Sequence, residues 1–253
     1  MGWPLAVLWS VVVLYVTLGL RQFSFHFTQI RDALADADED RARELLAQWQ
    51  QIDASDLPRS EIVRHVIEHS VLSAHRHVFA VLAWFSVLAA FGFGPAGAVL
   101  YRLSEFVVRY WQHKSKTQHL PVSDALQASA TRAWFLMDWL PARITAISFA
   151  VVGSFEEVID SWRNYEPRSP ADNDGIILAA TAGAVNIKLG DAASKAAYPV
   201  DGFPAMSLDA SRESSMGQAP ELAHLAVIVG LVWRTVVMWM VLLALLTLAR
   251  LLG

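Results

Sequence analysis

Four histidines lie in one thirteen-residue stretch, and two of them, His65 and His69, form the sequence HVIEH. On a helix, residues four apart share one face, so both imidazoles would lie beside the carboxylate of Glu68. His-x-x-Glu-His is the signature of the inverted zinc peptidases, which need a further ligand from elsewhere in the chain. One hypothesis is therefore zinc-dependent peptide hydrolysis with His65 and His69 as ligands. We favour the other, a row of histidines at a surface or an interface, because a pattern with two open positions has low specificity.

A second polar group lies in MDWLPARI, Met137–Ile144, where Asp138 and Arg143 flank Pro141 inside an apolar stretch. Proline interrupts the hydrogen bonding of a helix and frees backbone carbonyls. Charged side chains in apolar surroundings are costly unless they are paired or hydrated. We expect either an ion pair between Asp138 and Arg143 at a kink, or a polar pocket that a substrate enters from the membrane surface.

The composition indicates the setting for these residues. Of the 253 residues, 55% are hydrophobic and only 17% are charged, whereas soluble domains carry about 25% charged residues. Met1–Leu20 carries no charge, and Leu225–Leu252 is apolar apart from two arginines. About 20 apolar residues suffice to span a bilayer as a helix. We therefore predict an all-α, polytopic integral membrane protein with helical segments between the spans and the lipid bilayer as its partner.

Residue counts exclude nucleic-acid binding and cysteine chemistry. The net charge of −4 and the lack of a basic stripe argue against nucleic acid as a partner. The chain has no cysteine, so thiolate metal sites and cysteine nucleophiles are excluded.

The predicted organisation, in chain order, is a transmembrane helix over 1–20, a polar helical region over 21–77, a membrane-associated helical core with a Gly/Pro break over 78–160, a loop-rich segment with a short helix over 161–221, and a C-terminal transmembrane helix over 222–253.

Several segments, in this order and spacing, resemble the CobD/CbiB family of cobalamin-biosynthesis membrane proteins. The resemblance covers residues 23–202 and implies a multi-pass protein of the bacterial inner membrane. The enzymes of this family join adenosylcobyric acid to an aminopropanol or its phosphate in an ATP-dependent amide synthesis. It therefore implies ATP and Mg²⁺ as cofactors where the activity is retained, and a corrinoid or phosphorylated small molecule as ligand. The matching segments are EIVRHVIEH (Glu61–His69), GPAGAVLYR (Gly94–Arg102), WLPARITA (Trp139–Ala146) and NDGIILAATAGAVNIKLG (Asn173–Gly190).

The resemblance also supplies candidate ligand-binding residues, while no catalytic residue is assigned. Arg102 and Arg143 have the guanidinium fork that suits phosphate or carboxylate groups. Glu61 and Glu68 lie two helical turns apart on one face and could orient a cation or these arginines. The full set of candidates is Asp53, Glu61, Glu68, Arg102, Asp138, Arg143 and Asn173.

The chain departs from the family's pattern at several acidic positions. Where the enzymes carry Glu-Asn and Asp-Gly, this chain has Leu72–Ser73 and Arg76–His77. Their Asp-Asp pair before the Pro-Ala-Arg motif becomes Trp134–Phe135, and their Asn-Thr-Leu-Asp becomes Ser104–Val107. Carboxylates that could hold Mg²⁺ and a nucleotide phosphate are thus largely replaced. The MDWLPARI segment is also similar to AmpE, a membrane protein of the same superfamily linked to β-lactamase regulation.

Three functional hypotheses follow. The first, which we favour, is a repurposed, non-catalytic family member with a regulatory or sensing role, which forms a homo-oligomer or binds another membrane protein. The second is an active adenosylcobinamide-phosphate synthase. The third is the zinc peptidase suggested by HVIEH.

Overall fold

The computed structural model describes residues 12–14, 17, 20–50, 52–118, 124–165, 172–190 and 217–252. Most of the span predicted over 1–20 lies outside these residues. Every regular element in the described part is helical, which confirms the all-α class. The helices are α2 (Leu20–Ala35), α3 (Glu39–Gln50), α4 (Arg59–Ala74), η1 (His75–Phe79), α5 (Ala80–Ala90), α6 (Ala96–Gln118), α7 (Asp124–Val152), α8 (Phe155–Asn164), α9 (Asn173–Val185) and α11 (Leu222–Leu252).

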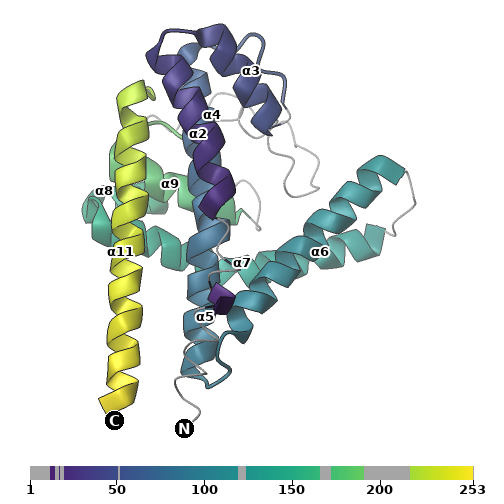
Figure 1. Cartoon of the computed structure of the whole chain (residues 1–253), viewed down its shortest axis with the longest axis vertical. Helices are drawn as coiled ribbons and strands as arrows, with labels where there is room; N and C mark the ends of the chain where they lie inside the picture. Colours follow the sequence, from purple (N-terminus) through teal and green to yellow (C-terminus); the bar gives the residue numbers. More distant parts are fainter. Residues whose placement is uncertain are drawn as a thin grey trace.

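One continuous helical rod, made of α4, η1 and α5, runs along the long axis of the molecule beside α11 (Figure 1). Helices α2 and α3 lie at its upper end, and α8 and α9 pack together beside its middle. Helix α6 and the first part of α7 extend sideways as a hairpin arm, and the rest of α7 crosses the rod to reach α9. The crossing of α7 and the rod is where the polar residues of the sequence meet.

Three described helical stretches are long and apolar enough to cross a membrane, which confirms the polytopic prediction. They are Arg59–Ala90, Ser129–Val152 and Leu222–Ala249. The first begins inside the region predicted as polar, 21–77, and the boundary expected after residue 77 falls within η1. The charged and histidine side chains of this stretch lower its apparent apolarity, yet most of them are buried against other helices.

A tight turn between α5 and α6 reverses the chain. Gly92 and Gly94 adopt positive φ angles of 87° and 58°, a region that glycine reaches without steric cost. At Gly97 a Cβ atom would lie 2.0 Å from the carbonyl oxygen of Trp84. The backbones of α5 and α6 therefore touch, which fixes the start of the arm against the rod.

Candidate functional site

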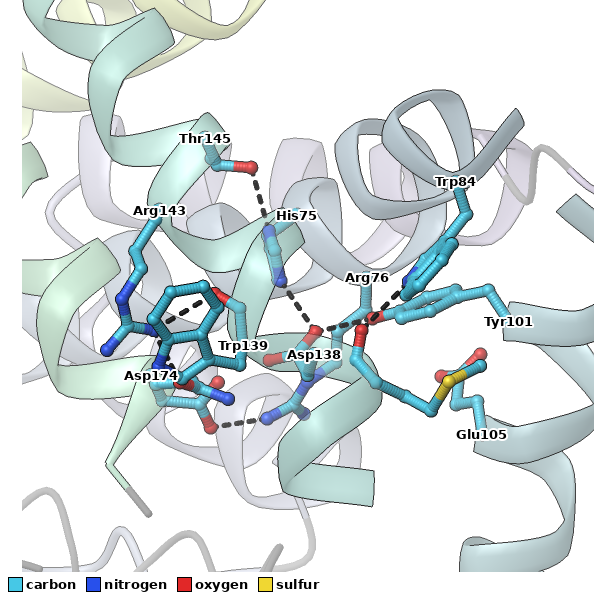
Figure 2. A network of polar contacts seen from close by, with 12 residues as sticks. His75, Arg76, Trp84, Tyr101, Glu105, Asp138, Trp139, Arg143, Thr145 and Asp174 are labelled. Atoms are coloured by element: carbon cyan, nitrogen blue, oxygen red, sulfur yellow. Dashed lines mark hydrogen bonds and ion pairs between the residues drawn. The ribbon is translucent and has the colours of Figure 1, made fainter. Parts of the chain in front are cut away.

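The site is organised by η1, a π-helical turn in the middle of the rod. Such turns carry one residue more than an α-helical turn and occur frequently at functional sites. Here three consecutive basic residues, His75, Arg76 and His77, reach three different helices. His75 contacts α7 and Arg76 contacts α9 (Figure 2). His77 contacts α6.

His75 lies in a line of buried hydrogen bonds. Its Nε2 is 3.0 Å from Oδ1 of Asp138, and its Nδ1 is 2.9 Å from Oγ1 of Thr145. The hydroxyl of Tyr101 donates to the same Oδ1 of Asp138 at 2.8 Å. Burial, and next the charge of Asp138, raise the pKa of Tyr101 well above its usual value. Asp138 is thereby held by donors from the rod and from α6.

Arg76 forms the second branch, an ion pair with Asp174 in the first turn of α9. The neighbouring Asp172 caps that helix, because its Oδ1 accepts the backbone N–H of Gly175 at 2.9 Å. The hydroxyl of Tyr165 donates to the other oxygen of Asp172. Both acids at the start of α9 are therefore engaged by groups of this chain.

Arg102 forms the third branch, on α6. Its Nη1 donates to Glu105 at 2.5 Å and to Nδ1 of His77 at 2.8 Å. Its Nε donates to the carbonyl of Thr17 at 2.9 Å. The predicted ligand-binding residue Arg102 thus belongs to the network around η1, with its charge balanced by Glu105.

Pro141 does not end α7, which continues through it as far as Val152. Proline lacks an N–H, so the carbonyl four residues earlier, that of Met137, has no helical donor. The indole Nε1 of Trp84 donates to this carbonyl at 2.8 Å. Asn173 donates from Nδ2 to the carbonyl of Phe135 at 3.2 Å. Side chains from α5 and α9 therefore stabilise the helix around its proline.

Arg143 lies on α7 two residues after Pro141 and is half-buried. Its Nη1 donates to the carbonyl of Trp139 at 2.9 Å and to Oδ1 of Asn173 at 3.2 Å. The guanidinium carbon lies 4.0 Å from the centre of the Trp139 ring, a cation–π arrangement. The expected ion pair between Asp138 and Arg143 is therefore wrong, because each residue binds a different helix.

The HVIEH segment lies away from this network, on α4. Oε1 of the fully buried Glu68 accepts the backbone N–H of Gly190 at 2.7 Å. The ring of His69 packs edge-on against Trp49 at 4.4 Å, and His65 is buried. Of the two alternatives predicted for the histidine row, a surface or an interface, the surface is wrong for His65 and for His75, which is also fully buried. No group of three His, Asp or Glu side chains in the described part of the chain lies close enough to hold a metal ion.

The structure thus groups only some of the predicted site residues. Asp138, Arg143 and Asn173 lie together where α7 meets α9, and Arg102 joins the network through His77. Glu61 and Glu68 contact Arg64 on α4 instead of either predicted arginine. Asp53 lies in the exposed turn before α4, where bonds from the hydroxyl and backbone N–H of Ser55 lower its pKa.

Several residues of the network were not among the predicted site residues. One sequence signal could have found part of them. The triplet His75-Arg76-His77 lies between the apolar runs VLSA and VFAVLAWF, and charges in such a position must find partners. The partners themselves come from distant segments and carry no local signal. The residues that were missed are His75, Arg76, His77, Tyr101, Glu105, Thr145 and Asp174.

The described side chains do not fit the Mg²⁺ and ATP that the resemblance implies. Mg²⁺ is bound through carboxylates together with substrate phosphates and water. In this network Asp138 is bound by His75 and Tyr101. Asp174 is bound by Arg76, and Glu105 is bound by Arg102. Asp174 and Glu105 therefore lie beside arginine charges of the chain itself, and Asp138 accepts hydrogen bonds from side chains of the same chain.

Comparison with known proteins supplies the family. The chain matches the model of the CobD/Cbib protein family over residues 1–223. It is 31% identical to a cobalamin biosynthesis protein CobD of Stutzerimonas stutzeri, over 96% of this chain and 72% of that relative. It is 33% identical to a protein of the same description from Chromobacterium violaceum, over 75% of this chain and 57% of the relative. No solved structure matches the chain. The chain therefore belongs to the CobD/CbiB family.

Proposed function

We propose that this chain is a multi-pass protein of the bacterial inner membrane that binds a corrinoid or phosphorylated small molecule without carrying out amide ligation itself. The observation that carries the proposal is the pairing of the site's acids. Asp138, Asp174 and Glu105 each contact a basic residue of the chain. ATP-dependent activation of a carboxylate needs acids that hold a metal ion to neutralise charge during transfer.

Arg143 is the residue that we assign to ligand binding. Both of its side-chain hydrogen bonds come from Nη1, and no described residue accepts a bond from Nε or Nη2. These two groups form one edge of the guanidinium fork, which matches the oxygen pair of a carboxylate or phosphate. Trp139, 44% exposed, lies beneath the guanidinium and offers an apolar ring beside the charge. An anionic ligand with a flat or apolar portion suits this combination.

A binding measurement tests this assignment. Protein in nanodiscs is dialysed against adenosylcobyric acid, and bound corrinoid is read from its visible absorbance. We expect Arg143→Ala to lose at least tenfold in affinity, and Arg143→Lys to lose less, since lysine keeps the charge without the fork. Arg234→Ala is the matched control, because Arg234 is exposed and its Nε bonds only the carbonyl of Gly230. Equal affinity of Arg143→Ala and the control would refute the assignment.

An active adenosylcobinamide-phosphate synthase is the second candidate function. The names of the relatives favour it, since all of those compared are described as cobalamin biosynthesis proteins. Complementation separates the two candidates. This chain is produced in the membrane of a strain that lacks its own synthase, and the Stutzerimonas stutzeri relative is produced in the same strain for comparison. We expect the strain that produces this chain to grow only when cobalamin is supplied. Restored growth would favour the second candidate and overturn the first.

A further inference from the structure

The lower end of α11 differs from its upper part. Between Leu222 and Trp239, buried residues recur every three or four positions, so one face of the helix packs on the bundle. From Met240 to Ala249 every residue is exposed except Leu243, which is half-buried. This part of the helix is apolar and has no described neighbour on most of its circumference. Its C-terminal end projects below the bundle in Figure 1.

The distribution of charge along α11 matches this division. No charged residue lies between Arg234 and Arg250. Arg234 is exposed, its Nε bonds the carbonyl of Gly230 at 3.2 Å, and no described acid forms an ion pair with it. An exposed arginine of this kind is costly in hydrocarbon and stable in water or among lipid headgroups. Arg234 therefore belongs outside the hydrocarbon layer.

The all-round exposure indicates what covers the lower end. A protein partner covers one stripe of a helix, whereas lipid tails cover an apolar helix on every side. Met240, Val241 and Leu246 are 44%, 54% and 52% exposed and point to three different sides of the helix. The turn after α5, which carries the exposed Phe91 and Phe93, lies at the same end of the molecule (Figure 1). Lipid is the one partner that fits all of these surfaces together.

We infer that the surface of the bilayer crosses α11 between Arg234 and Met240, so that lipid surrounds the lower ends of α11 and α5 and not the whole of either apolar stretch. The helix from Arg234 to Arg250 rises about 24 Å, compared with a hydrocarbon layer of about 30 Å. Long basic side chains at helix ends bridge differences of this size by reaching to the headgroups. The helices above this level, α2, α3, α8 and α9, stand on the aqueous side.

This boundary changes the setting of the site. Trp239 donates from Nε1 to Oγ of Ser148 at 3.2 Å, which ties this level of α11 to the helix that carries Arg143. Arg143 and the network around η1 then lie near the membrane surface and not deep in hydrocarbon. A further consequence, which rests on the proposed function, is that a water-soluble anionic ligand reaches Arg143 from the aqueous phase without crossing lipid.

Single spin labels test the boundary without reference to any ligand. The chain has no native cysteine, so one cysteine at a time can be introduced and labelled. Ala226 and Ala244 are both exposed, and eighteen residues are five full helical turns, so the two positions share one face. Val237, also exposed, lies between them near the proposed surface.

In proteoliposomes, the accessibility of each label to oxygen, which concentrates in lipid, is compared with its accessibility to a water-soluble nickel chelate. We expect the oxygen-to-nickel ratio to be several-fold higher at Ala244→Cys than at Ala226→Cys, with Val237→Cys between them. A lipid-like ratio at Ala226 would overturn the inference, because the bilayer would then cover the whole of α11. Exclusion of both reagents at Ala244 would also overturn it, because a protein partner or a second copy would cover that end. Melting curves of the three cysteine variants, compared with that of the wild type, show that they are folded whichever way the ratios fall.

Discussion

Trp84 donates its indole N–H to the carbonyl of Met137 at 2.8 Å, and this is the carbonyl that Pro141 leaves without a helical donor. The tryptophan comes from α5 and the proline from α7, so the bond also joins the two helices. A proline inside a helix interior costs about 3 kcal/mol or more when its effects are uncompensated. In this protein the compensation comes from a residue more than fifty positions away in the chain.

Trp84→Phe should therefore destabilise the protein by about 1–3 kcal/mol, the cost of leaving a partly buried carbonyl without its donor. Phenylalanine keeps most of the apolar contact, so the loss reports mainly on the hydrogen bond. Unfolding by SDS in mixed micelles measures the free energy. Trp233→Phe is the control, since Trp233 is 62% exposed and surface substitutions usually change stability by less than about 0.5 kcal/mol. Equal losses in the two variants would contradict this role for Trp84.

The ion pair between Arg76 and Asp174 should be strongly coupled. The pair is partly buried, with side chains 11% and 22% exposed. Removing one partner should therefore cost up to about 3–5 kcal/mol, the value for a fully buried pair, because the other charge is left uncompensated. Arg76→Met and Asp174→Leu should each be strongly destabilising, and the double variant should lose clearly less than the sum of the two. The exposed pair Arg31–Asp32 provides the control cycle, for which about 0–1 kcal/mol is expected. Additive losses at Arg76 and Asp174 would show that the pair does not act as a unit.

Two glycine-to-alanine substitutions should act in opposite directions. At Gly97 the new Cβ would lie 2.0 Å from the backbone oxygen of Trp84, so α5 and α6 would be forced apart and stability should fall. At Gly230, inside α11, nothing lies within 4 Å of the new Cβ. Gly230→Ala should therefore stabilise the helix by about 0.5–1 kcal/mol. Melting temperatures of the two variants check the signs, and tolerance of Gly97→Ala would argue against the close contact of the two helices.

Tyr101 should remain protonated in the folded protein near pH 11, above the usual tyrosine pKa of about 10. Burial, and then the charge of Asp138, raise its pKa. Because the folded pKa lies above the unfolded one, its contribution to stability is complete below about pH 10 and falls as the pH rises further. Tyrosinate absorbance of the folded wild type and of Tyr101→Phe should be equal at pH 11. After denaturation at the same pH, the tyrosinate absorbance of the variant should be lower than that of the wild type by the share of one tyrosine in five. A difference already present in the folded state would contradict the raised pKa.

The sequence was sufficient for the helical class, the membrane setting and the family, because each depends on local composition or on motifs in series. It was insufficient for the pairing of charges. Asp138 and Arg143 are five positions apart and were expected to pair, yet Asp138 faces the rod and α6 while Arg143 faces α9. The direction of each side chain depends on where α7 crosses its neighbours, and that crossing is a tertiary property.

The π-helical turn is the second feature that sequence periodicity could not supply. At 3.6 residues per turn, His75 and His77 do not converge on one point, so the sequence did not suggest a shared site. In the structure they and Arg76 lie on the π-helical turn η1 and reach three different helices. His65 and His75 were expected at a surface or an interface, and both are buried. The hydrogen bonds of His75 to Asp138 and Thr145 explain how its burial is tolerated.

The most direct test of the central claim is a product assay on the purified protein. Full-length protein in nanodiscs is incubated with adenosylcobyric acid, aminopropanol phosphate, ATP and Mg²⁺, and the products are analysed by mass spectrometry. The proposed pairing of Asp138, Asp174 and Glu105 within the chain predicts bound adenosylcobyric acid that is recovered unchanged, with binding lost in Arg143→Ala. Formation of the amide by the wild-type protein, in amounts that exceed the protein and require ATP, would contradict it.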